Sequence, residues 1–134
     1  MKSNYFEIIR GGLNSTFQDQ GRENLYHIGL PFSGAMDKRN YLIANKLLNN
    51  NRNDAVIEFA FQGPALKYFG EKRNIVVTGN VNFKILRNNN TQDSGECYKT
   101  IKIENGDTID IFSTNKSVYG YFSVNGGFKL DKVW

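Results

Sequence analysis

The fold class is decided by the stretch Tyr98-Lys99-Thr100-Ile101-Lys102-Ile103-Glu104-Asn105-Gly106-Asp107-Thr108-Ile109-Asp110-Ile111. Apolar residues alternate with polar ones on both sides of Asn105-Gly106, which is the period of a strand buried on one face. An Asn-Gly pair suits the positive φ angles of a tight turn. The sequence therefore predicts a β-hairpin with strands over residues 98–103 and 108–112.

Strand-like runs recur through the rest of the chain. Each run is short, rich in β-branched and aromatic residues, and bounded by turn residues. The runs cover residues 5–9, 14–18, 55–61, 65–69, 74–78, 83–86 and 117–124. Together with the two strands of the hairpin they make nine predicted strands, so we expect a mainly β protein.

One segment has a helical period instead. Apolar residues recur there at the spacing of one helix face, at Tyr41, Leu42, Ala44, Leu47 and Leu48. Asp37 can accept hydrogen bonds from the free amides of the first turn, and the Asn run at 49–51 ends the pattern. These features predict a single short helix over about residues 38–48, packed against a small barrel or sandwich.

Length and composition favour one folded domain. The chain has 134 residues, of which 40% are hydrophobic and 22% charged, as is typical of globular chains. We expect a single β-barrel domain over residues 1–134. Because the chain ends on a large apolar residue soon after the last predicted strand, we also expect it to be the N-terminal part of a longer protein.

Charge and apolar patterning exclude several classes of partner. The net charge is +4, but Lys and Arg are spread along the chain with no run longer than two, so we expect no nucleic-acid partner. No apolar run is long enough to span a membrane, and residues 1–4 lack the apolar core of a secretory signal. A cytoplasmic protein without a membrane partner is expected. With one Cys and one His, neither a disulfide nor a multi-thiolate zinc site can form, and no metal is expected.

The densest group of chemically special residues lies between positions 18 and 37. It comprises the strings Gln18-Asp19-Gln20-Gly21-Arg22, His27-Ile28-Gly29-Leu30-Pro31 and Ser33-Gly34-Ala35-Met36-Asp37. Glycines allow such a loop to fold compactly and to hold side chains in fixed directions. Asp19 and Arg22 can form an ion pair that fixes the loop, or they can act as a general base and as a clamp for an anionic substrate.

The string from Ser33 to Asp37 leads into the predicted helix. Free amides and the helix dipole can bind a phosphate or a carboxylate at such a position. Asp37 can equally serve as a plain N-cap, with Ser33 in the preceding turn. The string lacks the Gly-Lys-Ser or Gly-Lys-Thr ending of a Walker loop, so it predicts no nucleotide site.

Three isolated residues have open roles. His27 has no assignable partner and can be a packed residue or a catalytic one. Glu58 lies in an apolar strand, where it is either a buried carboxylate that needs a partner or a solvent-facing charge. Cys97 has no activating neighbour apart from Lys99, so we expect an inert thiol.

The order and spacing of these residues resemble those of one known family. The matching strings are Gln18-Asp19-x-Gly21-Arg22, Gly29-x-Pro31-x-Ser33-Gly34-Ala35-Met36-Asp37, Asn45, Glu58, Gly63-Pro64, Thr78-Gly79 and Tyr121-x-x-Val124-x-Gly126-Gly127. They resemble the N-terminal part of the family of 5-oxoprolinase C subunits, also described as biotin-dependent carboxyltransferase-like, urea amidolyase-related or allophanate hydrolase subunit 2. Asn24, Asn80 and Tyr119 depart from the family's pattern.

The resemblance implies a cyclophilin-like β-barrel that works with two partner proteins, which are similar to the B and A subunits of 5-oxoprolinase. Such complexes use ATP to open 5-oxo-L-proline, a small cyclic amide, to L-glutamate. One alternative is a biotin-dependent carboxyltransferase component that acts on urea or a related amide. Another is a non-catalytic protein that binds and regulates a B-type partner. Family members continue past Gly126-Gly127 into a second barrel, so we expect this chain alone to be inactive.

On this resemblance the expected catalytic residues are Asp19, Arg22 and Glu58. The expected substrate-binding residues are Gln18, His27, Ser33, Gly34 and Asp37. Arg22 would hold the substrate carboxylate, Asp19 would orient it, and the helix start would receive an anionic group.

Overall fold

The computed structural model describes residues 4–11, 16–19, 32–34, 38–51, 54–114 and 119–128. Within these ranges the chain forms eleven β-strands and one α-helix. In chain order they are β1 (Tyr5–Arg10), β2 (Thr16–Asp19), β3 (Phe32–Gly34), α1 (Lys38–Leu47), β4 (Val56–Ala60), β5 (Ala65–Phe69), β6 (Arg73–Thr78), β7 (Val81–Leu86), β8 (Gln92–Ser94), β9 (Ile101–Ile103), β10 (Thr108–Thr114) and β11 (Tyr119–Val124). No helix in this described part is both long and apolar enough to cross a membrane.

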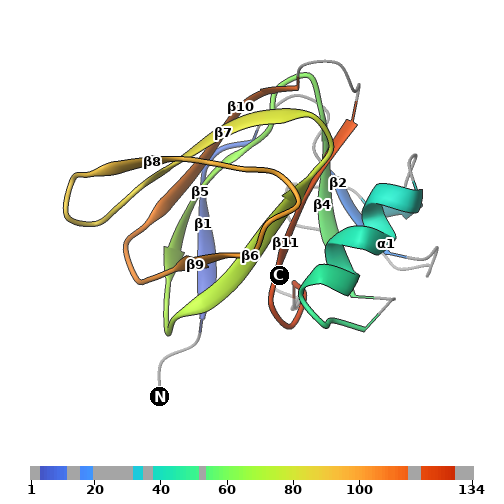
Figure 1. Ribbon diagram of the computed structural model, residues 1–134, viewed down its shortest axis with the longest axis horizontal. Helices are drawn as coiled ribbons and strands as arrows, with labels where there is room; N and C mark the ends of the chain where they lie inside the picture. Colours follow the sequence, from blue (N-terminus) through green and yellow to red (C-terminus); the bar gives the residue numbers. More distant parts are fainter. Residues whose placement is uncertain are drawn as a thin grey trace.

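The strands form two sheets that pack face to face (Figure 1). One sheet has five strands in the order β1-β5-β10-β7-β8, and the other has six in the order β3-β2-β4-β11-β6-β9. β2 and β3 run parallel, and the other strand pairs of the described residues are antiparallel. The parallel pair lies at one edge of the six-stranded sheet.

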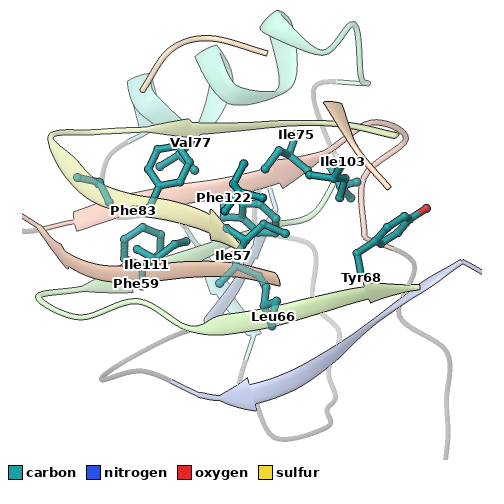
Figure 2. Close-up of a cluster of buried hydrophobic side chains, with 14 residues drawn as sticks. Ile57, Phe59, Leu66, Tyr68, Ile75, Val77, Phe83, Ile103, Ile111 and Phe122 are labelled. Atoms are coloured by element: carbon teal, nitrogen blue, oxygen red, sulfur yellow. The ribbon is translucent and has the colours of Figure 1, made fainter. Parts of the chain in front are cut away.

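The main hydrophobic core lies between the two sheets. Figure 2 shows Ile57 and Phe122 of the six-stranded sheet beside Leu66 of the five-stranded sheet. Alternation along β7 illustrates how the sequence produces this core, because Phe83 and Ile85 are buried while the residues next to them are partly exposed. Successive side chains of a strand point to opposite faces, so one set of each strand enters the core.

α1 covers the other face of the six-stranded sheet, where it contacts β4, β6 and β11 (Figure 1). Its buried side chains recur at the spacing of a single helix face, at Tyr41, Ala44, Asn45 and Leu48. Asn49, with a φ of 57°, ends the helix in a Schellman motif. The amide of Asn49 donates to the Lys46 carbonyl, and that of Asn50 donates to the Asn45 carbonyl. The predicted helix and its termination by the Asn run are therefore confirmed.

The mainly β class with one short helix is also confirmed, since each of the nine predicted strands overlaps an observed one. The sequence pattern misses β3 and β8, because three residues are too few to display a period and β8 is exposed throughout. The described strands form two sheets, and no closed barrel is found among them. The predicted cyclophilin-like barrel is therefore not confirmed.

The predicted hairpin at Asn105-Gly106 is wrong. β9 pairs with β6 in one sheet, whereas β10 pairs with β5 and β7 in the other. The Asp107 amide donates to the Glu104 carbonyl at 3.0 Å, and of the two central residues only Gly106 has a positive φ, at 91°. One positive φ at this position is typical of a type II turn, whereas the tight type I′ hairpin needs two. The turn therefore carries the chain from one sheet to the other.

Asp107 fixes this turn through a buried carboxylate. The carboxylate accepts hydrogen bonds from Arg87 Nη1 at 2.8 Å, from the Glu104 amide at 2.8 Å and from the Asn88 amide at 3.1 Å. The Asp107 side chain is 4% exposed. Arg87 also forms an ion pair with Asp93, whose side chain is 57% exposed. One buried charged group thus joins the turn between the sheets to the β7–β8 hairpin.

Asp107→Ala is expected to lower the free energy of unfolding by about 3 kcal/mol, because the Arg87 guanidinium loses its buried charged partner and the amides of Asn88 and Glu104 lose their carboxylate acceptor. Asp93→Ala removes the exposed partner of the same arginine and is expected to cost less than about 1 kcal/mol. Urea unfolding curves of both variants and the parent measure the difference. Equal midpoints for the two variants would contradict the role assigned to Asp107.

Candidate functional site

One edge of the six-stranded sheet brings together parts of two of the strings singled out in the sequence. β2 and β3 run parallel in a register that pairs Gln18 with Ser33 and Asp19 with Gly34. Asp19 and Gly34 are the last residues of their strands, so the two strands end side by side. Four of the predicted site residues are therefore backbone neighbours.

The register also relates this edge to Glu58. Gln18 pairs with Val56 on β4, two residues before Glu58. Positions two apart in a strand belong to the same face of the sheet. Gln18, Ser33 and Glu58 thus occupy positions on the face that α1 covers, whereas Asp19 occupies a position on the opposite face.

A row of polar residues crosses the α1 face at the level of Glu58. Cross-strand pairing aligns Thr16 of β2 with Glu58 of β4, Tyr121 of β11 and Thr78 of β6. Glu58 is 5% exposed, and Tyr121 and Thr78 are each 0% exposed. We call Glu58, Tyr121 and Thr78 the polar row.

Glu58 is a buried carboxylate, which settles the alternative left open by the sequence. Its neighbours Ile57 and Phe59 lie in the core between the sheets, so the pleat sends Glu58 to the α1 face. The Tyr121 hydroxyl donates a hydrogen bond to the Glu58 carboxylate. Buried carboxylates with a specific partner are enriched at functional sites.

The first turn of α1 lies over the polar row. Thr78 Oγ1 donates to the carbonyl oxygen of Asn40 at 2.9 Å. Tyr41 packs against Val56 and Tyr121. Residues 35–37 connect the end of β3 to the start of α1. The β2–β3 edge and the polar row are therefore joined by a short stretch of chain.

Asparagine side chains hold the other end of α1, which the sequence pattern does not predict. Asn45 Nδ2 donates to the Asp54 carbonyl at 2.9 Å, and Asn50 Nδ2 donates to Asn45 Oδ1 at 3.1 Å and to the Val124 carbonyl at 2.9 Å. The Gly126 amide donates to Asn50 Oδ1 at 2.7 Å. Asn45 and Gly126, which both match the family pattern, thus have structural roles here. The sequence of an Asn run does not indicate which of its side chains will form these hydrogen bonds.

The remaining predicted site residues are Arg22, His27 and Asp37, and they lie outside the described residues. The Asp19–Arg22 ion pair, the role of His27 and the Asp37 cap therefore stay predictions. In the described ranges, no group of three or more His, Cys, Asp and Glu side chains could hold a metal ion.

Cys97 has the environment of an unreactive thiol. Its side chain is partly buried against the main core, and its thiol donates to the Val81 carbonyl at 3.4 Å. Burial raises the pKa of the Cys97 thiol. Since the thiolate is the nucleophile, a raised pKa lowers its reactivity at neutral pH.

This two-sheet domain with a helix over a buried polar row is of the carboxyltransferase type. The family model described as "Carboxyltransferase domain, subdomain A and B" matches residues 28–134. The chain belongs to this family, and the family recognised from its sequence strings is confirmed.

The relatives include two kinds of enzyme. The urea amidolyase of Saccharomyces cerevisiae is 27% identical over 127 residues, which cover 94% of this chain and 7% of the relative. The C subunit of the 5-oxoprolinase of Haemophilus influenzae is 32% identical over 127 residues, which cover 95% of this chain and 40% of the relative.

Two solved structures have a similar fold. The crystal structure of the K. lactis urea amidolyase matches with a TM-score of 0.77 and 28% identity, over 95% of this chain and 7% of that one. The Kluyveromyces lactis urea carboxylase matches with a TM-score of 0.74 and 29% identity, over 91% of this chain and 10% of that one. The chain thus spans less than half the length of each of these proteins.

Tyr121→Phe is expected to lower the free energy of unfolding by about 2 kcal/mol, because the buried Glu58 carboxylate loses a donor. The double variant Glu58→Gln/Tyr121→Phe is expected to recover part of this loss, since a neutral amide costs less to bury than a carboxylate. Urea unfolding of the two single variants and the double variant forms a double-mutant cycle. Strictly additive losses would show that the two side chains are not coupled.

Proposed function

We propose that this chain supplies part of the C subunit of an ATP-dependent 5-oxoprolinase, which opens 5-oxo-L-proline to L-glutamate together with B-type and A-type partner proteins. The observation that carries the proposal is the 32% identity with a 5-oxoprolinase C subunit across 95% of this chain. The register that puts Gln18, Ser33 and Glu58 on one face of the sheet supports it.

The proposed roles follow from the chemistry of the substrate, which has a carboxylate and a cyclic amide. Arg22 holds the carboxylate with two parallel N–H···O bonds, and Asp19 orients Arg22. In the sequence, Arg22 follows Asp19, the last residue of β2, by three positions. Asp37 follows Gly34, the last residue of β3, by three positions. Both loop segments therefore begin next to each other, where the parallel strands end.

We assign proton transfer to Glu58. When water adds to the amide carbon and the ring opens, a C–O bond forms, the C–N bond breaks and the nitrogen takes up a proton from the water. The Glu58 carboxylate, which is buried and accepts a hydrogen bond from the Tyr121 hydroxyl, is assigned the transfer of this proton. The start of α1, which lies over this pair, is assigned the binding of an anionic group.

ATP supplies the driving force, because phosphorylation of an amide oxygen turns an unreactive lactam into a better electrophile. The turn amides of Gly70, Gly79 and Gly126 already donate to side-chain oxygens, so we do not assign phosphate binding to these three turns. We assign ATP to the complex.

A biotin-dependent carboxyltransferase component that acts on urea or a related amide is the second candidate. The similarity of the fold to that of a urea amidolyase and a urea carboxylase favours it. Biotin is assigned to this alternative only. A third candidate is a non-catalytic protein that binds and regulates a B-type partner.

The purified chain alone is expected to show no 5-oxoproline-dependent ATP hydrolysis, and its mixture with the partner proteins is expected to show it. Release of phosphate with and without 5-oxoproline measures this activity. Turnover of urea that is lost on addition of avidin would favour the carboxyltransferase instead. A stable complex without turnover of either substrate would favour the binding role, and turnover by the chain alone would contradict the need for partners.

Arg22→Ala in the assembled complex is expected to raise the KM for 5-oxoproline by about 100-fold with little change in kcat, because a charge-assisted pair to the carboxylate is lost in ground state and transition state alike. Lys72→Ala removes an exposed positive charge between β5 and β6, away from the start of α1, and as the control it should leave both constants unchanged. Kinetics of the Arg22 variant equal to those of the control would rule out the clamp.

A further inference from the structure

The backbone of Tyr98 is strained, and hydrogen bonds to neighbouring strands hold it in this conformation. Its φ is 62°, a left-handed conformation that is rare for bulky residues. The Tyr98 amide donates to the Val77 carbonyl at 2.8 Å, and the Gly95 amide donates to the Phe83 carbonyl at 2.8 Å. These bonds fasten the β8–β9 connection to β6 of one sheet and to β7 of the other. Strain of this kind persists only where the surrounding structure determines it, and it concentrates at functional sites.

The Tyr98 hydroxyl joins two elements that are far apart in the sequence. It donates to Asn40 Oδ1 at 2.7 Å and accepts from the Gly79 amide at 3.0 Å. Asn40 is in the first turn of α1, and Gly79 is in the turn between β6 and β7. Gly79 has a φ of 105°, which only glycine adopts readily, so the turn can present its amide to the hydroxyl.

Burial of apolar surface does not account for Tyr98. The residue is 46% exposed, so a large part of its ring remains in water. Asn40, by contrast, is held twice, because its backbone carbonyl accepts from Thr78 Oγ1 and its side chain accepts from the Tyr98 hydroxyl. The hydroxyl is therefore the part of Tyr98 that serves the structure, and its target is the start of α1.

We infer that Tyr98 is a positioning residue, which fixes the first turn of α1 over the polar row. The sequence places Tyr98 at the start of a strand and gives no sign of this contact. The hydrogen bonds of Tyr98 support its role in fixing the helix start. Its effect on substrate binding rests on the proposed function.

Tyr98→Phe removes the hydroxyl and keeps the ring, so it tests this role directly. Hydrogen exchange of the purified chain is expected to be about fivefold faster at amides 41–44, whose helical acceptors lie in the first turn, because one hydrogen bond to that turn is lost. Exchange at amides 45–48 is expected to be unchanged. Tyr5→Phe is the matched control, since Tyr5 is 55% exposed on β1 of the other sheet.

The assembled complex provides the second readout. Tyr98→Phe is expected to raise the KM for 5-oxoproline about fivefold with kcat changed by less than about twofold, because a looser helix start holds the substrate less well. A merely structural role would lower the amount of active complex and leave KM unchanged.

The outcomes separate this inference from the proposed function. Uniformly faster exchange along the chain, or no change at 41–44, would overturn the positioning role. Faster exchange at 41–44 with an unchanged KM in an active complex would also overturn it as a role in substrate binding. If the parent complex does not turn over 5-oxoproline at all, the proposed function fails, and the exchange measurement alone decides whether Tyr98 fixes the helix start.

Discussion

The hydrogen bonds that attach α1 to the six-stranded sheet determine where the candidate site can form. Apolar contacts such as that of Tyr41 with Val56 favour burial, but they are not directional and would allow the helix to slide. The bonds at the two ends of the helix are directional, since Thr78 donates to the Asn40 carbonyl and Asn50 donates to the Val124 carbonyl. A buried polar group that loses its partner is costly, so one position of the helix satisfies both ends.

This attachment gives the family-like residues two kinds of role. Asn45, Thr78 and Gly126 belong to the contacts that hold α1 in place. The residues at 18–19 and 33–34 belong to the sheet edge, where two strands end together. Recognition of a motif therefore does not assign chemistry to each of its members. The structural members act at a distance, because they set the place where the loop residues meet the sheet.

The sequence predicts those features that depend on local period, and it misses those that depend on distant partners. Strands and the helix follow from patterns of five or more residues, and the end of α1 follows from an asparagine that can adopt a positive φ. An Asn-Gly pair such as Asn105-Gly106 can form either a tight hairpin turn or a type II turn. Which of the two forms depends on the sheets that the flanking strands join. The direction of Glu58 and the partner of Tyr98 depend on residues more than 50 positions away in the chain.

The Glu58–Tyr121 pair differs from the contacts of Thr78 and Asn45 in what it joins. Thr78 and Asn45 donate to the main-chain carbonyls of Asn40 and Asp54 and so attach α1 to the parts of the chain beside it. The bond between Glu58 and Tyr121 joins two side chains, and replacing both partners of such a bond by apolar groups of the same shape can be nearly neutral for stability. A sheet face under a helix therefore does not need a carboxylate at this position. We therefore propose a chemical role for this carboxylate beside the helix start, and within the polar row we assign that role to the Glu58–Tyr121 pair and not to Thr78, which holds the helix.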